Sequence, residues 1–151
     1  MQPILQPTFA ERLSGLWSTF HSKVEFTVSE SEVHYLRTLA VAVDDDLVSY
    51  LLLKKLRLAK AVPPADLPPG TAVMHSFVEF SFDGGEARFV QIVHPPSPPS
   101  SYGLSVTSRL GAGLIGLRRG QTILWPDAEG NLCDLYVAHV ESGSGLPRAG
   151  L

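Results

Sequence analysis

Three adjacent aspartates, Asp44 to Asp46, form the one cluster in this 151-residue sequence with clear chemical potential. Adjacent carboxylates on a turn can hold Mg²⁺ while leaving coordination positions open for water. The structural alternative is helix capping, because an aspartate at a helix start accepts hydrogen bonds from the free amide groups there. The sequence favours capping, and whether the triplet also holds Mg²⁺ stays open.

The five histidines do not indicate a metal centre. They lie at positions 21, 34, 75, 94 and 139, without the close spacing or the cysteine partners that make a zinc site credible. His75, His94 and His139 fall on expected strands, where polar positions of an outer sheet face explain them. No serine or cysteine lies in a recognisable nucleophile motif. The sequence therefore predicts no catalytic residue, no bound metal and no cofactor.

Three glycines, Gly111, Gly113 and Gly116, match the G-x-G-x-x-G pattern of dinucleotide-binding proteins, and Asp134 follows at a suitable distance. That fold needs a long crossover after the glycines, usually a helix. Here Gly120 and a new strand follow almost at once. We interpret the glycines mechanically: they let a short helix lie close to the sheet and end abruptly.

Length and composition fit one globular domain. Hydrophobic residues make up 44% and charged residues 18%, enough apolar material for a core. Twelve Lys and Arg against 15 Asp and Glu give a net charge of −3, which disfavours direct nucleic-acid binding. Cys133 is the single cysteine, so no internal disulfide forms. No apolar stretch resembles a secretory signal or a membrane span, so we expect a cytoplasmic protein.

The elements that position the aspartates begin with an N-terminal extension, residues 1–22. Thr8 and Glu11 form a capping box, which predicts a short amphipathic helix. Its apolar residues recur at helical spacing: Phe9, Leu13, Leu16 and Phe20. This stripe either packs on the rest of the chain or pairs two copies of the protein.

Residues 23–61 predict a strand followed by two short helices. Ser29 and Glu32 form a second capping box at the start of the first helix. The second helix runs from Leu47 through Ala61 and carries basic residues in its later part, where cations suit the helix dipole. The acidic turn between the helices makes an antiparallel hairpin the simplest arrangement.

A proline-rich linker, residues 62–70, separates the hairpin from the body, because proline lacks an amide donor. Residues 71–141 alternate with a period of two and predict an antiparallel sheet, with a hairpin turn at Asp83-Gly84-Gly85 and one short helix that Ser108 caps. Residues 95–101 predict a stiff loop, and the tail 142–151 has a disordered composition. The predicted fold class is α+β: a short helical hairpin plus an antiparallel β-sheet domain with one short helix.

The segment from Leu104 to Gly120, LSVTSRLGAGLIGLRRG, resembles the signature of the Gre-type C-terminal domain of transcription factors. The strand at 73–80 and the closing strands at 121–125 and 135–141 are similar as well, so the resemblance covers about residues 23–141. Because the hairpin is short, the chain is more similar to the family's regulators of nucleoside diphosphate kinase than to the cleavage factors GreA and GreB.

This resemblance implies an FKBP-like sheet with a projecting helical pair, and RNA polymerase as the partner, bound at the mouth of its secondary channel. The implied polymerase-binding residues lie at the strand-to-helix corner: Ser105, Thr107, Ser108, Arg109 and Leu110. Arg109 stands where the family usually has proline, which alters the partner-binding edge. The aspartate triplet would form the hairpin tip and probe the channel entrance.

The short length of the hairpin argues against stimulation of transcript cleavage. The first hairpin helix, residues 31–43, spans only about 20 Å at about 1.5 Å per residue, so its tip stops short of a catalytic centre deep in the pore. The family's tip also pairs Asp with Glu beside an Asn, unlike this triplet. We therefore expect a non-enzymatic regulator of transcription elongation that occupies the entrance, with no sequence-specific nucleic-acid contact and no membrane association.

Two alternatives stay open. One is a peptidyl-prolyl isomerase, since FKBP-like sheets serve that activity, although it needs an aromatic-lined pocket and the body offers only scattered Tyr102, Trp125 and Tyr136. The other is a stand-alone interaction module that forms a homodimer through residues 9–20.

Overall fold

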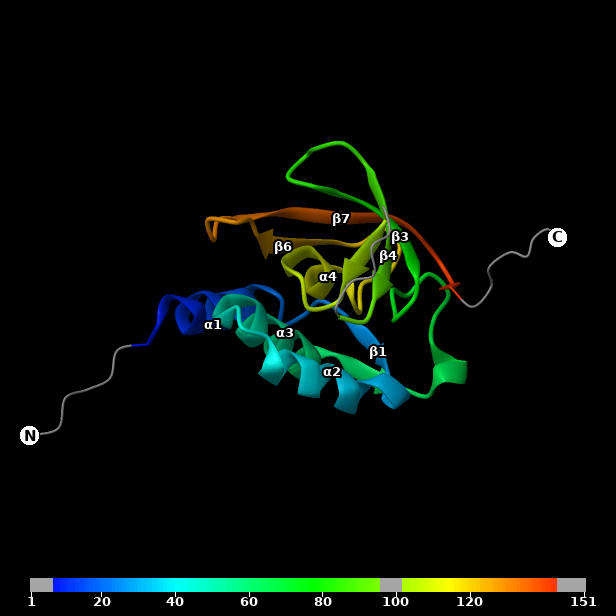
Figure 1. Ribbon diagram of the computed structural model, residues 1–151, viewed down its shortest axis with the longest axis horizontal. Coiled ribbons are helices and arrows are strands. Elements are labelled where there is room, and N and C mark those ends of the chain that lie inside the picture. The colour runs from blue at the N-terminus through cyan, green and yellow to red at the C-terminus, as the bar shows by residue number, and fades with distance from the viewer. Residues whose placement is uncertain (1–6, 96–101, 144–151) are drawn as a thin grey trace, which may run out of the picture.

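The computed structural model describes residues 7–95 and 102–143, so most of the expected loop at 95–101 and of the tail at 142–151 lies outside the described residues. A sheet lies over a layer of helices (Figure 1). The helices are α1 (Phe9–Phe20), α2 (Glu30–Ala42), α3 (Asp46–Leu58) and α4 (Arg109–Leu114), with a short 3-10 helix at Pro64–Asp66. In the described part of the chain, no helix is both long and apolar enough to cross a bilayer.

The sheet confirms the α+β fold class. Its strands are β3 (Phe77–Phe82), β4 (Arg88–Val93), β5 (Gly103–Ser105), β6 (Thr122–Pro126) and β7 (Leu132–Glu141), in the order β5-β4-β3-β7-β6. Neighbours are antiparallel except β5, which runs parallel to β4. Asp83 and Gly84, at φ of 56° and 72°, form the tight turn between β3 and β4, as their types predict.

The second hairpin helix ends earlier than predicted. It stops at Leu58 rather than Ala61, and β2 (Lys60–Val62) follows directly, parallel to β1 (Thr27–Ser29). The amide of Lys60 donates to the carbonyl of Phe26 at 2.8 Å. Pairing with a distant strand thus replaces the last helical turn, which local periodicity could not foresee.

Two further local predictions were wrong where α2 meets the sheet. Regular pairing in β3 begins at Phe77 rather than Val73, because Ser76 Oγ accepts from the amide of Val73 at 3.0 Å and closes a turn. Ser29 caps α2 as predicted, but Glu32 does not complete the capping box. Its Oε1 accepts from the amide of Met74 at 3.4 Å instead, so it ties the helix to that turn.

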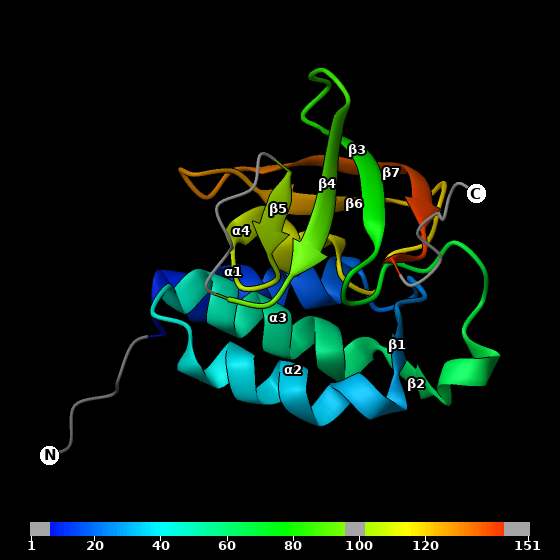
Figure 2. The ribbon, with the colours of Figure 1, turned by 45° about the vertical axis from the view of Figure 1, so that its right-hand side comes forward.

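The hairpin forms as predicted, but it does not project. α3 lies between α2 and α1 and also contacts α4 beneath the sheet (Figure 2). Leu51 and Leu52 of α3 are fully buried, and Val48 and Leu56 are nearly so. Apolar side chains on more than one face of α3 require cover on more than one side. The pair therefore lies along the body, contrary to what the resemblance implies.

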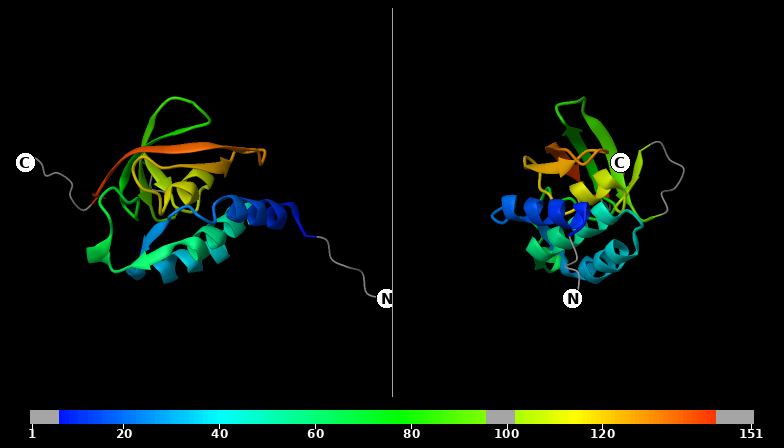
Figure 3. Two further views of the ribbon diagram at one scale, coloured as in Figure 1. Left: turned by 180° about the vertical axis from the view of Figure 1, so that it is seen from behind. Right: turned by 90° about the vertical axis from the view of Figure 1, so that its left-hand side faces the viewer.

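Side-chain hydrogen bonds anchor α1 to the edge strand β6, and Figure 3 shows α1 beneath that end of the sheet from behind and from one side. Its predicted capping box is present, and Trp17 is fully buried. The indole of Trp17 donates to the carbonyl of Leu124 at 2.6 Å, and His21 Nε2 accepts from the amide of Leu124 at 3.0 Å. These side chains satisfy backbone groups that an edge strand otherwise leaves open.

The outer face of α1 carries a second set of apolar residues. Phe9, Leu16 and Phe20 are 54%, 49% and 55% exposed, on the stripe that the sequence singled out. Packing of the stripe on the rest of the chain is therefore not confirmed for these three residues: the buried residues of α1 are Ala10, Ser14 and Trp17, on its inner face. The stripe itself is only partly covered within residues 7–95 and 102–143.

The mechanical interpretation of the glycines is confirmed. A Cβ on Gly111 would overlap the carbonyl of Ser105, and one on Gly113 would lie 2.8 Å from the side chains of Leu135 and Trp125. Gly116 has a φ of 86°, which ends α4 in the left-handed region. Close approach of α4 to the sheet explains the pattern without any dinucleotide.

Candidate interaction site

The hairpin tip presents its three aspartates to solvent. Asp45 caps α3: its Oδ1 accepts from the amides of Leu47 at 3.0 Å and Val48 at 3.2 Å. The capping interpretation is therefore confirmed for Asp45. The carboxylates of Asp44 and Asp46 have no hydrogen bond or ion pair within the part of the chain that the structure describes, so they are available to a partner.

The side chains at the hairpin tip do not gather into a metal-binding cluster among the described residues. Among residues 7–95 and 102–143, no three His, Cys, Asp or Glu side chains gather in an arrangement that could hold an ion. The chemistry open to the tip is therefore charge recognition by separate carboxylates.

The strand-to-helix corner is held together by its own hydroxyl groups. Ser108 Oγ accepts from the amide of Gly111 at 3.1 Å, which caps α4, and donates to the carbonyl of Ser105 at 2.5 Å. Ser105 Oγ and Thr107 Oγ1 lie 2.9 Å apart. Leu110 is buried. These groups shape the corner, and their contact with a partner stays a prediction.

Arg109 joins α4 to the sheet from the same corner. Its Nη1 donates to the carbonyl of Pro126 at 2.9 Å, and its guanidinium lies 5.6 Å from the centre of the Phe82 ring. Trp125 in turn donates its indole N–H to the carbonyl of Arg109 at 2.7 Å. A proline at position 109 could start the helix, but it could not make the guanidinium contacts.

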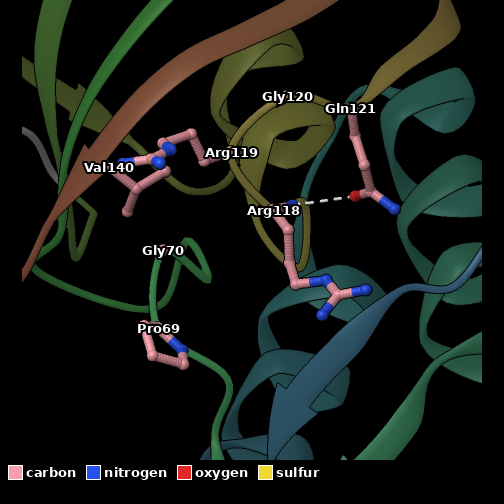
Figure 4. Close-up of a pocket in the computed structure, with 7 residues that line it drawn as sticks. All are labelled: Pro69, Gly70, Arg118, Arg119, Gly120, Gln121 and Val140. Carbon is pink, nitrogen blue, oxygen red and sulfur yellow. Dashed lines mark hydrogen bonds between the residues drawn. The ribbon is translucent and has the colours of Figure 1, made fainter.

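An arginine-lined cavity of about 580 Å³ lies beside the loop that follows α4 (Figure 4). Arg118 Nη2 lies 3.2 Å from Glu25 Oε1 and forms an ion pair with it. The backbone amide of Arg118 donates to Gln121 Oε1 at 2.8 Å. Arg119 points the other way, toward Val140, and its guanidinium has no hydrogen bond or ion pair among the described residues. A free guanidinium at a cavity suits a carboxylate or another anion on a partner.

Sequence reasoning missed this cavity. The only signal was the Arg118-Arg119-Gly120 run at the end of the signature segment. The other wall comes from Pro69 and Gly70, roughly fifty residues away in the proline-rich segment. Only the tertiary structure brings the two together.

A second group that the sequence did not connect lies where α2 meets the end of β4. His94 Nε2 is 3.1 Å from His75 Nε2, and His94 Nδ1 is 2.5 Å from the hydroxyl of Tyr35. Burial lowers the pKa of His94, and the nearby His75 lowers it further. Burial likewise raises the pKa of Glu32, although the amide of Met74 and His75 oppose that rise.

The aromatic residues that an isomerase pocket would need do not meet. Trp125 is fully buried, whereas Tyr102 and Tyr136 are 47% and 41% exposed. A fully buried ring cannot line an open substrate pocket. The prolyl-isomerase alternative therefore gains no support from these three side chains.

Comparisons with known proteins agree with the Gre-type signature. No protein-family model matches the chain. Over 89 residues, or 58% of this chain, the sequence is 34% identical to the regulator of nucleoside diphosphate kinase of Escherichia coli (strain K12) and equally to that of Shigella flexneri. The match spans 65% of each of these curated relatives, slightly less than two thirds of their length.

A solved structure shows the same fold. The prokaryotic transcription elongation factor GreA/GreB from Nitrosomonas europaea superposes with a TM-score of 0.62 and is 25% identical in sequence. The superposition covers 78% of this chain and 98% of that one. The resemblance to Gre-type transcription factors, and within them to the regulators of nucleoside diphosphate kinase, is thereby confirmed.

Proposed function

We propose that this protein is a non-enzymatic, RNA polymerase-binding regulator of transcription elongation that occupies the secondary-channel entrance without stimulating transcript cleavage. Its similarity to a transcription elongation factor and to the regulators of nucleoside diphosphate kinase supports a regulatory role. The binding mode is the one that the Gre-type resemblance implies.

The observation that carries the proposal is the short, docked hairpin. α2 has 13 residues, which corresponds to about 20 Å of helix. α3 is buried against α1 and α4 along its length, so the hairpin cannot swing away without exposing Leu51 and Leu52. The tip aspartates therefore stay near the body, and the body blocks the entrance while the tip remains outside the catalytic centre.

Two surfaces could hold the polymerase. The strand-to-helix corner supplies Thr107, which is half-buried, next to the signature helix. The arginine-lined cavity supplies the free guanidinium of Arg119, which suits an acidic side chain of a protein partner. A net charge of −3 fits a protein partner better than a nucleic acid.

The decisive experiment is competition with a Gre factor for core RNA polymerase, using purified proteins and a labelled Gre factor. We expect displacement at micromolar concentration, and no RNA cleavage when the protein is added to backtracked complexes. Thr107→Val should weaken displacement, whereas Thr122→Val, the same change on the exposed part of β6, should not.

Two results would overturn the proposal. One is the lack of any association with core polymerase at micromolar concentration. The other is cleavage of backtracked RNA that disappears when Asp44, Asp45 and Asp46 are all changed to Asn, because the tip would then act at the catalytic centre.

A homodimer through α1 is a second candidate, favoured by the symmetry of its exposed stripe. Phe9, Leu13, Leu16 and Phe20 read the same in both directions, in residue type and in spacing. A twofold antiparallel pairing would place Phe9 opposite Phe20 and Leu13 opposite Leu16 of the second copy. Arg12 would then approach the partner's helix end, whose last turn has no basic residue.

Light scattering at increasing protein concentration tests this pairing. Leu16→Glu should abolish any dimer, whereas Val41→Glu, at an exposed apolar position of α2, should leave it intact. A monomeric wild-type protein at high concentration would exclude the dimer and leave the polymerase proposal unaffected.

A further inference from the structure

We propose that His75 and His94 form a binding site for a divalent transition-metal ion of the Cu²⁺, Ni²⁺ or Zn²⁺ class. Both histidines are exposed, so an ion can reach them from solvent. Neutral imidazole nitrogen is a preferred ligand of these ions. The inference is independent of polymerase binding.

The spacing of the two ring nitrogens matches that of neighbouring ligands on one ion. His75 Nε2 and His94 Nε2 lie 3.1 Å apart. With metal–nitrogen bonds of about 2.05 Å, that separation corresponds to an N–metal–N angle of about 98°. This angle lies between the tetragonal and the tetrahedral values that these ions adopt.

The ring positions give a second geometric test. If both rings pointed at one ion at this angle, their centroids would lie about 4.8 Å apart, whereas a straight N–H···N hydrogen bond would separate them by about 5.4 Å. The observed centroid separation is 4.9 Å, with the ring planes inclined by 58°. The observed separation is therefore close to that of two rings that share one ion, and the ion would replace the hydrogen bond that joins the two nitrogens in its absence.

Neighbouring groups hold the His94 ring and the His75 backbone in place. The hydroxyl oxygen of Tyr35 in α2 lies 2.5 Å from His94 Nδ1. It can accept a hydrogen bond from Nδ1–H, which leaves the lone pair of Nε2 free for an ion. His75 has a φ of 72°, a left-handed conformation that is uncommon for residues other than glycine. Its carbonyl accepts from Gln91 Nε2 at 3.1 Å, which fixes the turn beside β4.

The site has two protein ligands and leaves the remaining positions to water. No third His, Cys, Asp or Glu completes a cluster among the described residues. Such an open site binds an ion more weakly than a closed structural zinc site and lets it exchange. An ion there would link the turn before β3 to the end of β4.

The experiment is titration of the untagged full chain with CuCl₂, followed by calorimetry and by electron paramagnetic resonance. We expect one equivalent of Cu²⁺ with a signal from two nitrogen ligands, and a higher melting temperature with the ion bound. His75→Asn, which tolerates the left-handed backbone, and His94→Gln should each remove the two-nitrogen signal. Tyr35→Phe should keep the signal but weaken binding by about 10-fold.

The matched control is His34→Gln, which removes an exposed histidine from α2 and should change nothing. Circular dichroism of each variant without metal separates lost binding from lost folding. The proposal fails if the wild-type chain binds no Cu²⁺. It fails equally if the two-nitrogen signal survives in either His75→Asn or His94→Gln, or if His139→Gln removes it.

Discussion

The centre of the molecule and the tip of the hairpin use charge in opposite ways. Lys55 is fully buried, and its ammonium donates to the carbonyls of Ala112, Gly113 and Ile115 at 2.8, 2.5 and 2.8 Å. The tip carries three carboxylates in solvent, of which Asp45 makes local capping bonds. One buried charge therefore organises the fold, while the two exposed carboxylates of Asp44 and Asp46 remain available for recognition.

The difference follows from the surroundings of each charge. The end of α4 leaves carbonyl groups without helical partners, and an ammonium group has three donors to satisfy them. The rings of Trp125 and Phe26 lie 5.0 and 5.5 Å from the ammonium nitrogen and add favourable cation–π contact. Burial nevertheless lowers the pKa of Lys55 well below its ordinary value. Removing this side chain should therefore be costly.

The largest effect is expected for Lys55→Met, which keeps the apolar stem and removes the ammonium. Three buried carbonyls would lose their donor, so the free energy of unfolding should fall by about 3 kcal/mol or more. Chemical denaturation measures the change. Lys54→Met, at a half-buried neighbouring position, is the control and should change stability little. Equal losses of unfolding free energy in the two variants would show that the contacts of the Lys55 ammonium add no special stability.

An intermediate effect is expected from pH, through His21. Its Nδ1 donates to the carbonyl of Trp17 at 2.7 Å and its Nε2 accepts from the amide of Leu124, so the neutral ring is required. Burial lowers its pKa below 6.5; the Trp17 carbonyl opposes this, and Lys55 adds to it. The unfolded chain then binds the proton more readily, so stability falls as pH drops from about 6.5 through the folded-state pKa.

The slope of unfolding free energy against pH tests this contribution. One extra proton in the unfolded state corresponds to at most about 1.4 kcal/mol per pH unit. His21→Asn should be less stable at neutral pH and should show a shallower acid slope than the wild type. His34→Gln should keep the wild-type slope. An unchanged slope in His21→Asn would show that this ring is not held neutral.

The smallest effects are expected at the tip. Asp45→Ala removes a helix cap and should lower the free energy of unfolding by about 1 kcal/mol. Asp44→Asn should lie within about 0.5 kcal/mol of the wild type, because its carboxylate has no partner in the described structure. Thermal and chemical unfolding measure both changes. A larger loss in Asp44→Asn than in Asp45→Ala would contradict the division between capping and free carboxylates.

Sequence reasoning succeeded where the determinants were local. The capping box at Thr8, the cap at Ser108 and the Asp83-Gly84 turn depend on residues a few positions apart, and all three are confirmed. It failed where a distant partner competed. Glu32 bonds to Met74 instead of closing its own helix cap, and Lys60 pairs with Phe26 instead of extending α3.

The candidate site divides in the same way. The signature segment identified the corner and its helix, and the aspartate run identified the tip, because both are continuous in the chain. The arginine-lined cavity combines Arg118 and Arg119 with Gly70, and the histidine pair joins His75 to His94. Neither group has a spacing that a linear pattern could reveal.

The sequence by itself determined most of the helices and the strands of the sheet, the hairpin with its acidic turn, and the resemblance to Gre-type factors, but not β2. These depend on short-range periodicity, caps and a contiguous motif. Only the tertiary structure decided that the hairpin lies on the body, that Lys55 inserts beneath α4, and that His75 meets His94. Each of these depends on burial and on hydrogen-bond partners far apart in the chain, which no local pattern encodes.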